Sequence, residues 1–293
     1  MSMRVEKFMF NNILIPISSE FYSKRVLHQS VFLAEKFKSK LNLVYIIEEK
    51  TLAQADRMSD TYRTPLEKEE TKNEIIKKQK QTADDIIFND AKYYFKNKNI
   101  PFEEKIVEGE FSLVIKNEIR KNEYDLILMG FAKGCILNYR LLEEVNIPVW
   151  VEGKGEGNSI LAICSNLAPN QKVPDISIKL SKKLGWNLHM LYVIDIEDSV
   201  QVDENGIRSD RKPERDLYFS GQYFVREMKS KGINIELVKG NLEKETAKAA
   251  DSLKPNLIVV GREQKKKGLL GLPVKNVKKK IAEKCNYSIL FVN

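Results

Sequence analysis

The residues of this 293-residue chain that could do chemistry stand directly after short apolar runs rich in Ile, Val and Leu. Ser18 and Ser165 follow two of these runs, and Gly130 and Gly261 end two others. A glycine at such a place lets backbone amides approach a ligand closely, although the turn that it permits explains it equally well. The chemistry offered here is ligand binding through the backbone and small side chains.

Motifs for catalysis are missing from the sequence. It contains no GxxxxGK[ST] phosphate loop, no HExxH, no GxSxG and no acidic calcium loop. The two histidines, His28 and His189, fall in different halves of the chain, without cysteine or aspartate at a spacing that suggests a metal site. We therefore expect no metal, no catalytic residue and no enzyme.

The cellular compartment is read from the N-terminus and the cysteines. Residues 1–8 lack the apolar core of a signal peptide, and no stretch approaches the roughly 18 unbroken apolar residues of a membrane span. Cys135, Cys164 and Cys285 are widely spaced and odd in number, which favours reduced thiols, with Cys164 as a small core residue. We expect a cytoplasmic protein without a membrane partner.

Positive charge is gathered in one stretch. The formal net charge is +8, and through most of the sequence lysines and glutamates are interleaved, as on solvated helix faces. Residues 262–280 differ, because cationic side chains crowd there with Glu263 as the one acid among them. Such a cluster suits phosphate, nucleic acid or anionic lipid. The interleaved charges elsewhere argue against the last two, so we expect no nucleic-acid partner.

The elements that position these residues recur in the same order in both halves of the chain, which predicts a duplicated domain. Apolar runs without polar alternation indicate strands buried on both faces of a parallel sheet, and helix-length segments lie between them. The predicted strands are residues 13–17, 41–47, 103–107, 125–130 and 147–151 in the first copy, and 159–164, 187–194, 234–238, 256–261 and 287–292 in the second.

This alternation predicts an α/β fold with two tandem Rossmann-like domains, residues 1–152 and 159–293. A glycine-rich linker, residues 153–158, joins them. Its Gly-x-Gly-x-Gly pattern enters a strand, whereas a dinucleotide motif must open a helix. In the long lysine-rich segment of the first copy, the spacing of Ile76, Ala83, Ile87 and Tyr94 predicts a helix with a narrow apolar stripe that can lie on the sheet.

Ligands of open parallel sheets bind at the carboxyl ends of strands, where the strand order reverses. If the first strand of each copy is central, Ser165 and Gly261 meet at this point in the second copy. The segment after the fourth strand is short in the first copy, residues 131–146, and longer in the second, residues 262–286. The longer segment has room for a helix that begins near residue 273, whose N-terminus would attract phosphate.

These strand and glycine motifs occur in the same order in both copies, and together they resemble the universal stress protein family. The run from Ile13 to Glu20 is similar to the family's opening strand, Leu-x-Leu follows in the second strand, and Val-x-Gly precedes the third helix at Gly109 and Gly240. The resemblance implies HUP-type domains, each with five parallel strands in the order 3-2-1-4-5 and helices on both faces. Family dimers pair their last strands, so residues 147–151 should pair with 288–292 as an intramolecular pseudo-dimer.

Many members of that family bind ATP, and both copies depart from the pattern that does so. Ser18 and Ser165 replace the Asp that closes the first strand, Gln264 replaces a phosphate-loop glycine, and Lys275 and Asn276 stand where Gly-Ser/Thr is usual. The positions that the resemblance implies for a nucleotide in the second copy are Ile163, Ser165, Val193, Gly240, Val260, Gly261, Arg262, Gly268, Lys275, Asn276 and Val277.

Three functions stay open at this point. The first is a regulatory stress protein that holds ATP or AMP weakly in its second domain only, with lysine side chains supplying charge in place of glycine amides. The second is a module without nucleotide, whose basic loop 262–280 docks an acidic protein partner. The third is an enzyme that uses Asp195 and Glu197 to bind a metal. Association of two tandem chains into a homodimer is also left open.

Overall fold

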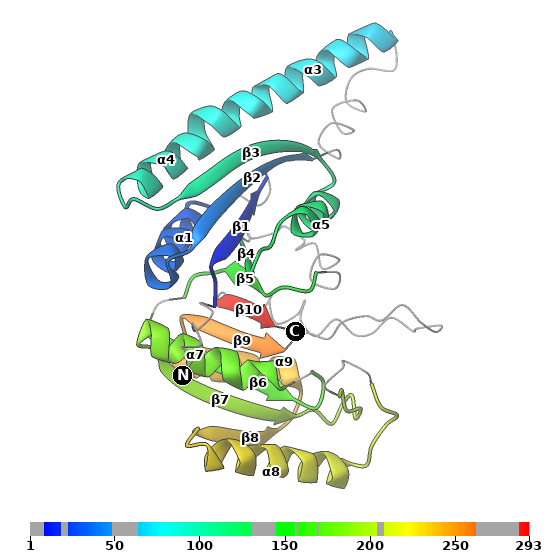
Figure 1. Ribbon diagram of the computed structural model, residues 1–293. Coiled ribbons are helices and arrows are strands. Elements are labelled where there is room, and N and C mark those ends of the chain that lie inside the picture. Colours follow the sequence, from blue (N-terminus) through cyan, green and yellow to red (C-terminus); the bar gives the residue numbers. More distant parts are fainter. Residues whose placement is uncertain are drawn as a thin grey trace. The chain divides into compact units, whose positions relative to one another are not determined.

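The structure, a computed structural model, describes residues 9–18, 23–48, 64–130, 145–155, 157–168, 170–203, 208–261 and 287–292. Two compact units, residues 1–136 and 137–293, make up the chain. Each unit is a mostly parallel sheet with helices packed on it (Figure 1). This confirms the predicted fold class, whereas the domain limits at residues 152 and 159 stay a prediction.

The sheet of the first unit has the strand order β3-β2-β1-β4. Its strands are β1 (Asn12–Ile17), β2 (Lys40–Glu48), β3 (Phe102–Gly109) and β4 (Leu126–Gly130). The central strand β1 is parallel to both neighbours, and Ile13 is paired with Leu41 on one side and with Leu126 on the other. Continuous apolar runs produce this pattern, because β1 and β4 are buried on both faces.

Helices cover both faces of this sheet. They are α1 (Lys24–Phe37), α3 (Pro65–Thr82), η1 (Ala83–Phe88), α4 (Asn89–Lys96) and α5 (Phe111–Lys121). In Figure 1, α1 and α5 lie on opposite sides of β1 and β2. On one face α1 packs directly against α4: the Lys24 ammonium lies 3.0 Å from the Asp90 carboxylate, and the rings of His28 and Tyr94 are 4.5 Å apart.

The predicted apolar stripe is only partly in contact with the sheet. Helix α3 begins with a capping box between Thr64 and Glu67, but none of its side chains is buried, so Ile76 lies outside the core. Burial starts at the π-helical turn η1, where Ala83 and Ile87 are covered. Because α3 is charged around most of its circumference, it has no continuous apolar face to lay on a sheet.

The sheet of the second unit has the strand order β5-β10-β9-β6-β7-β8. Its strands are β5 (Val149–Glu152), β6 (Ser159–Ser165), β7 (Asn187–Ile194), β8 (Ile235–Lys239), β9 (Leu257–Gly261) and β10 (Ser288–Val292). From β8 to β10 this is the predicted order 3-2-1-4-5. Strand β5 runs antiparallel to β10, with Trp150 opposite Leu290, which confirms the predicted pairing of the two fifth strands.

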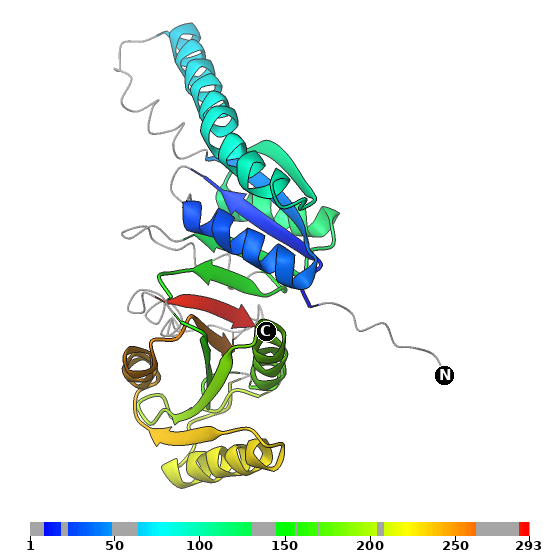
Figure 2. The same ribbon diagram turned by 90° about the vertical axis from the view of Figure 1, so that its left-hand side faces the viewer.

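The helices of the second unit are α7 (Lys172–Leu184), α8 (Glu214–Ser230) and α9 (Leu242–Leu253). Figure 2 shows α7 and α9 on opposite sides of the sheet. The spacing of Leu217, Phe224 and Met228 predicts an apolar stripe on α8; Leu217 and Met228 are buried, whereas Phe224 is half-buried. Cys164 in β6 is buried, as predicted. Among the described residues, no helix is both long and apolar enough to cross a membrane.

Two glycines of the segment before β6 lie in close contact with backbone. A Cβ atom on Gly153 would come within 2.4 Å of the Tyr287 carbonyl carbon, and one on Gly155 within 2.4 Å of the Asn256 carbonyl oxygen. The Asn256 side-chain amide also donates a 2.9 Å hydrogen bond to the Gly157 carbonyl. These glycines therefore allow the chain to lie against the starts of β9 and β10, in addition to linking two strands.

Substitution of Gly155 by alanine is expected to destabilise the second unit by about 1–3 kcal/mol, because the new methyl group overlaps a backbone carbonyl that cannot rotate away. Urea denaturation measures the change in the free energy of unfolding. The matched control is Lys154→Ala, whose side chain is exposed in the same segment. Equal stability of the two variants would show that the close approach is not required.

Candidate functional site

The carboxyl ends of β6, β7 and β9 bring together five of the predicted nucleotide positions. Ser165 is paired with Val193 across β6 and β7, Ile163 is paired with Val260 across β6 and β9, and Gly261 ends β9. The strand order reverses at β6, since β6 is paired with β7 on one side and with β9 on the other, and the chain reaches β9 from β8 at the far edge. The predicted edge of the sheet thus exists, and Ser165 and Gly261 both lie on it.

Most of these residues are part of the core. The side chains of Ile163, Val193 and Val260 are buried, and so is Ser165. Gly240 lies nearby, where its amide donates a 3.1 Å hydrogen bond to the Ile194 carbonyl at the end of β7. The remaining predicted positions and the basic loop lie outside the described residues: Arg262, Gly268, Lys275, Asn276, Val277 and residues 262–280. Their assignment to a nucleotide stays a prediction.

Ser165 is held by hydrogen bonds to the turn that follows β6. Its amide donates to Asn170 Oδ1 at 3.0 Å, and Asn170 Nδ2 donates to the Ser165 carbonyl at 2.8 Å. The amide of Leu167 donates to Ser165 Oγ at 3.1 Å. The end of the central strand is therefore closed by neutral groups, with an asparagine side chain acting as the bridge.

Asn166, the next residue, ties this turn to the loop after β7. Its Oδ1 accepts the Asp195 amide at 2.7 Å, and its Nδ2 donates to the carbonyls of Val200 at 2.8 Å and Asp195 at 3.1 Å. The side chain is buried, so this amide makes the bonds that buried polar groups require. Sequence reasoning placed Asn166 beside Ser165 at this edge but gave it no role, although an Asn directly after a strand is a known signal for side-chain bonding to a turn.

Asp195 is a buried structural carboxylate. Its Oδ1 accepts the amides of Glu197 at 2.9 Å and Asp198 at 3.1 Å, and its Oδ2 accepts the amide of Leu242, the first residue of α9, at 2.8 Å. The carboxylate thus joins the β7 loop to a helix N-terminus, where negative charge is favourable. Among the described residues no group of three or more potential ligands could hold a metal ion. This geometry supports a structural role for Asp195 instead of the metal site considered for the enzyme alternative.

The corresponding edge of the first unit is closed differently. Ser18, which follows β1, donates from Oγ to Oε1 of Glu48 at 2.7 Å, and both residues are buried. Glu48 ends β2 in the way that Asp195 follows β7. In the first unit the acid is therefore turned toward the end of the central strand, whereas in the second unit it is turned toward amides of the β7 loop and α9.

Cys164 and Tyr192, two buried titratable residues of the second unit, are unsuited to acid–base or nucleophilic chemistry at neutral pH. Burial raises the pKa of the Cys164 thiol well above its ordinary value, so the thiolate is disfavoured. Burial, with a smaller contribution from Cys164, also raises the pKa of Tyr192. Both groups therefore stay protonated and act as packing residues.

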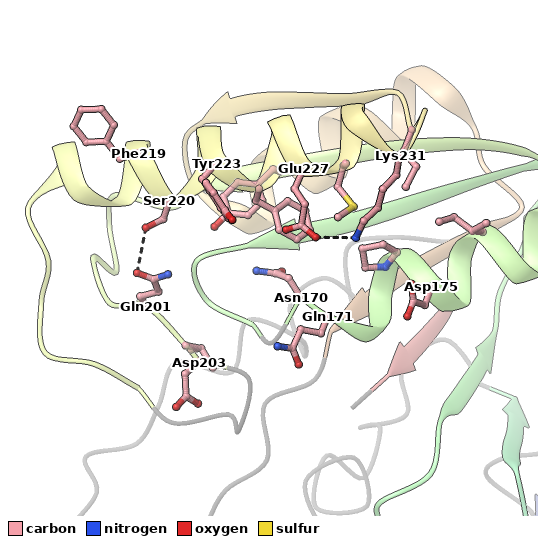
Figure 3. A pocket seen from close by; sticks show the side chains of 17 residues that line it. Asn170, Gln171, Asp175, Gln201, Asp203, Phe219, Ser220, Tyr223, Glu227 and Lys231 are labelled. Atoms are coloured by element: carbon pink, nitrogen blue, oxygen red, sulfur yellow. Dashed lines mark hydrogen bonds and ion pairs between the residues drawn. The ribbon is translucent and has the colours of Figure 1, made fainter.

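A cavity of about 790 Å³, which sequence reasoning missed, lies in the second unit (Figure 3). Helices α7 and α8 and the loop around residue 202 enclose it. The signal in the sequence was the aromatic pair Phe219 and Tyr223, one helical turn apart and exposed in α8. The residues that line it are Asn170, Gln171, Pro174, Asp175, Ile178, Tyr192, Gln201, Val202, Asp203, Phe219, Ser220, Tyr223, Phe224, Glu227, Met228, Lys231 and Ile233.

Comparison with known proteins identifies relatives of this fold. A model of the universal stress protein family matches residues 9–150. A universal stress protein structure from Archaeoglobus fulgidus superposes with a TM-score of 0.65 at 13% identity and covers 98% of this chain and 97% of its own. A putative universal stress protein from Pseudomonas aeruginosa gives a TM-score of 0.66 at 14% identity, with 97% of this chain and 93% of its own covered. No curated protein matches the sequence.

Proposed function

Because residues 9–150 make this chain a member of the universal stress protein family, we propose that it is a regulatory stress protein that binds ligands without catalysis. Its two domains, residues 1–152 and 159–293, form an intramolecular pseudo-dimer. The carboxyl-end edge of the second domain, at Ser165, Gly240 and Gly261, holds ATP or AMP weakly, and the first domain holds none. A protein partner then distinguishes the ligand-bound form of the chain from the ligand-free form.

The pairing of β5 with β10 supports the pseudo-dimer. Strand β5 is the fifth strand of the first repeat, and β10 is the fifth strand of the second. They are antiparallel over the pairs Val151 with Ile289, Trp150 with Leu290 and Val149 with Phe291. All six side chains are buried, as expected for strands that cover one another's unpaired edge.

The contrast between Ser18 and Ser165 carries the proposal that only the second domain binds nucleotide. In the first domain the Glu48 carboxylate is fixed 2.7 Å from Ser18 Oγ, so a negative charge stands at the end of the central strand and opposes a polyphosphate. In the second domain the partner of Ser165 is the neutral amide of Asn170. The internal bonds of Ser165 and Asn170 must compete with a ligand, which supports weak binding.

Calorimetric titration with ATP and AMP tests this proposal. We expect one equivalent of ATP per chain with a dissociation constant near the millimolar range, and Lys275→Glu should weaken binding by about tenfold, because it reverses a charge meant for phosphate. The matched control is Lys154→Glu, which makes the same charge change at the amino ends of β9 and β10. It should bind within about twofold of the unaltered chain.

Two outcomes would remove parts of the proposal. Two equivalents of ATP per chain would show that the Glu48 carboxylate does not close the first domain. No uptake at millimolar ligand, together with a nucleotide-free purified protein by native mass spectrometry, would exclude the nucleotide site. That result would favour the second candidate, an interaction module without nucleotide, which the internal hydrogen bonding of Ser165 and Asn166 supports. A pull-down that salt weakens and that charge reversal of Lys265, Lys266 and Lys267 abolishes would then identify the basic loop as its docking surface.

A further inference from the structure

The cavity between α7 and α8 has two distinct walls. Figure 3 shows Tyr223 and Glu227 of α8, and Lys231 directly after this helix, facing Asn170, Gln171 and Asp175 on the α7 side. Its volume of about 790 Å³ is in the range of sites for small organic molecules. The cavity does not coincide with the proposed nucleotide edge: Ser165, Gly240 and Gly261 are not among its lining residues.

The corresponding helices of the first unit are arranged differently. In the first unit the corresponding helices, α1 and α4, contact each other through the Lys24–Asp90 ion pair and the His28–Tyr94 ring contact. Helices α1 and α7 correspond because both bury a Val, a Ser and a Leu at the same spacing: Val26, Ser30 and Leu33 in α1, and Val173, Ser177 and Leu180 in α7. This alignment places Asp175 where α1 carries His28. The second copy has thus exchanged a ring that closes the helix pair for a carboxylate that lines a cavity.

Aromatic side chains form the floor and the rim of the cavity. The rings of Tyr192 and Phe224 are 5.2 Å apart at the floor, and Tyr192 is buried. At the rim, two large rings are open to solvent: Tyr223 is 72% exposed and Phe219 is 55% exposed. The Arg215 guanidinium already lies 5.4 Å from the centre of the Phe219 ring, so this rim attracts a cation of the chain itself.

The charges that line the cavity are mostly negative, in a chain whose net charge is +8. Asp175, Asp203 and Glu227 are acidic, and Lys231 is the one basic residue among the lining side chains. Glu227 is paired with Lys231 at 2.7 Å. Its hydrogen bond and charge raise the pKa of Lys231, and the charge of Asp175 adds to this effect. The charge of Asp175 therefore acts across the cavity on a basic side chain that lines the opposite wall.

We propose that this cavity binds a small organic cation with an apolar, preferably aromatic, body. The body packs on Tyr192, Phe224 and Met228, and the cationic group lies between the Asp175 carboxylate and the face of Tyr223. An anionic ligand such as a nucleotide is disfavoured by the same charges. The proposal is separate from the nucleotide site, since none of the predicted nucleotide positions lines the cavity and the two sites demand ligands of opposite charge.

Three ligands of nearly the same shape test the charge requirement: tryptamine as the cation, indole-3-ethanol as the neutral analogue and indole-3-acetate as the anion. Ligand-observed NMR and calorimetry on the full chain should show saturable binding in that order of affinity. Asp175→Asn should weaken tryptamine by about three- to tenfold and leave indole-3-ethanol unchanged, because it removes charge and keeps shape. Tyr223→Leu should weaken tryptamine by about threefold, because it removes the aromatic face and keeps an apolar side chain.

The matched control is Asp251→Asn, which removes an exposed carboxylate from α9 on the opposite face of the sheet. It should bind tryptamine as the unaltered chain does, and millimolar ATP should not displace the amine. Circular dichroism verifies that each variant is folded. Equal affinity for all three ligands, an effect of Asp251→Asn as large as that of Asp175→Asn, or no saturable binding of tryptamine would each overturn the proposal. Loss of ATP binding alone would leave it standing.

Discussion

Replacement of Trp150 by alanine is expected to destabilise the second unit by about 3–5 kcal/mol, the usual cost of truncating a fully buried aromatic side chain. Trp150 is 0% exposed, lies at the centre of the β5–β10 pairing opposite Leu290, and donates from Nε1 to Glu152 Oε2 at 3.0 Å. Its removal takes away both the packing and the indole hydrogen bond. Urea denaturation should therefore show a lower midpoint for the second unit.

The two tryptophans of the chain make this measurement specific. Once Trp150 is replaced, the remaining Trp186 is buried in the second unit and reports on that unit alone. The reference variant is Trp150→Phe, which keeps a ring and removes the competing fluorescence. Tyr93→Ala, at a ring that is 68% exposed in the first unit, should shift the Trp186 transition by less than about 0.5 kcal/mol. If Trp150→Ala changed the free energy of unfolding by as little as Tyr93→Ala, this would contradict the role assigned to β5.

Replacement of Asp195 by alanine is expected to cost about 3 kcal/mol, because it leaves the amides of Glu197, Asp198 and Leu242 without their acceptor. Asp195→Asn should be intermediate. Its carbonyl oxygen can still accept from the β7 loop, but its NH₂ group would face the Leu242 amide, and two donors cannot bond. Chemical denaturation followed by tryptophan fluorescence measures both changes, because Trp150 and Trp186 both lie in the second unit.

The control for Asp195 is Asp251→Ala, which removes an exposed carboxylate from α9. We expect this change to lie within about 0.5 kcal/mol of zero. If Asp195→Ala were as mild as Asp251→Ala, the carboxylate would not be structural, and the metal-binding alternative for Asp195 and Glu197 would regain support. The graded order alanine, asparagine, aspartate is therefore the result that distinguishes the two roles.

The strands of this fold were predictable because parallel strands buried on both faces give unbroken apolar runs. The run from Ile160 to Cys164 and the run from Leu257 to Val260 needed no knowledge of their neighbours to be recognised as strands. The helical stripe was less predictable. Its spacing continues through Ile76, but burial depends on whether a sheet lies beneath the helix, and that is a property of the whole unit.

The candidate sites depend on geometry that single residues do not reveal. Glu48 and Asp195 are both acids at the end of a second strand, yet one binds a serine side chain and the other binds backbone amides. Which one occurs depends on the path of the following loop. The cavity is still harder to predict from the sequence, because it arises from the separation of α7 and α8. The exchange of His28 for Asp175 indicates it only when the two copies are compared in three dimensions.

The antiparallel pairing of β5 with β10 has an evolutionary consequence. In a symmetric homodimer the central pair of such a ribbon brings a residue opposite its own copy, so every mutation acts twice. Here the central pair is Trp150 with Leu290, two different residues encoded at separate positions. A mutation in one strand therefore leaves the opposite strand unchanged, and the opposite strand can mutate separately. Once two copies are fused, mutations in each half are selected independently. One half can then keep a ligand site while the other loses it and gains stability.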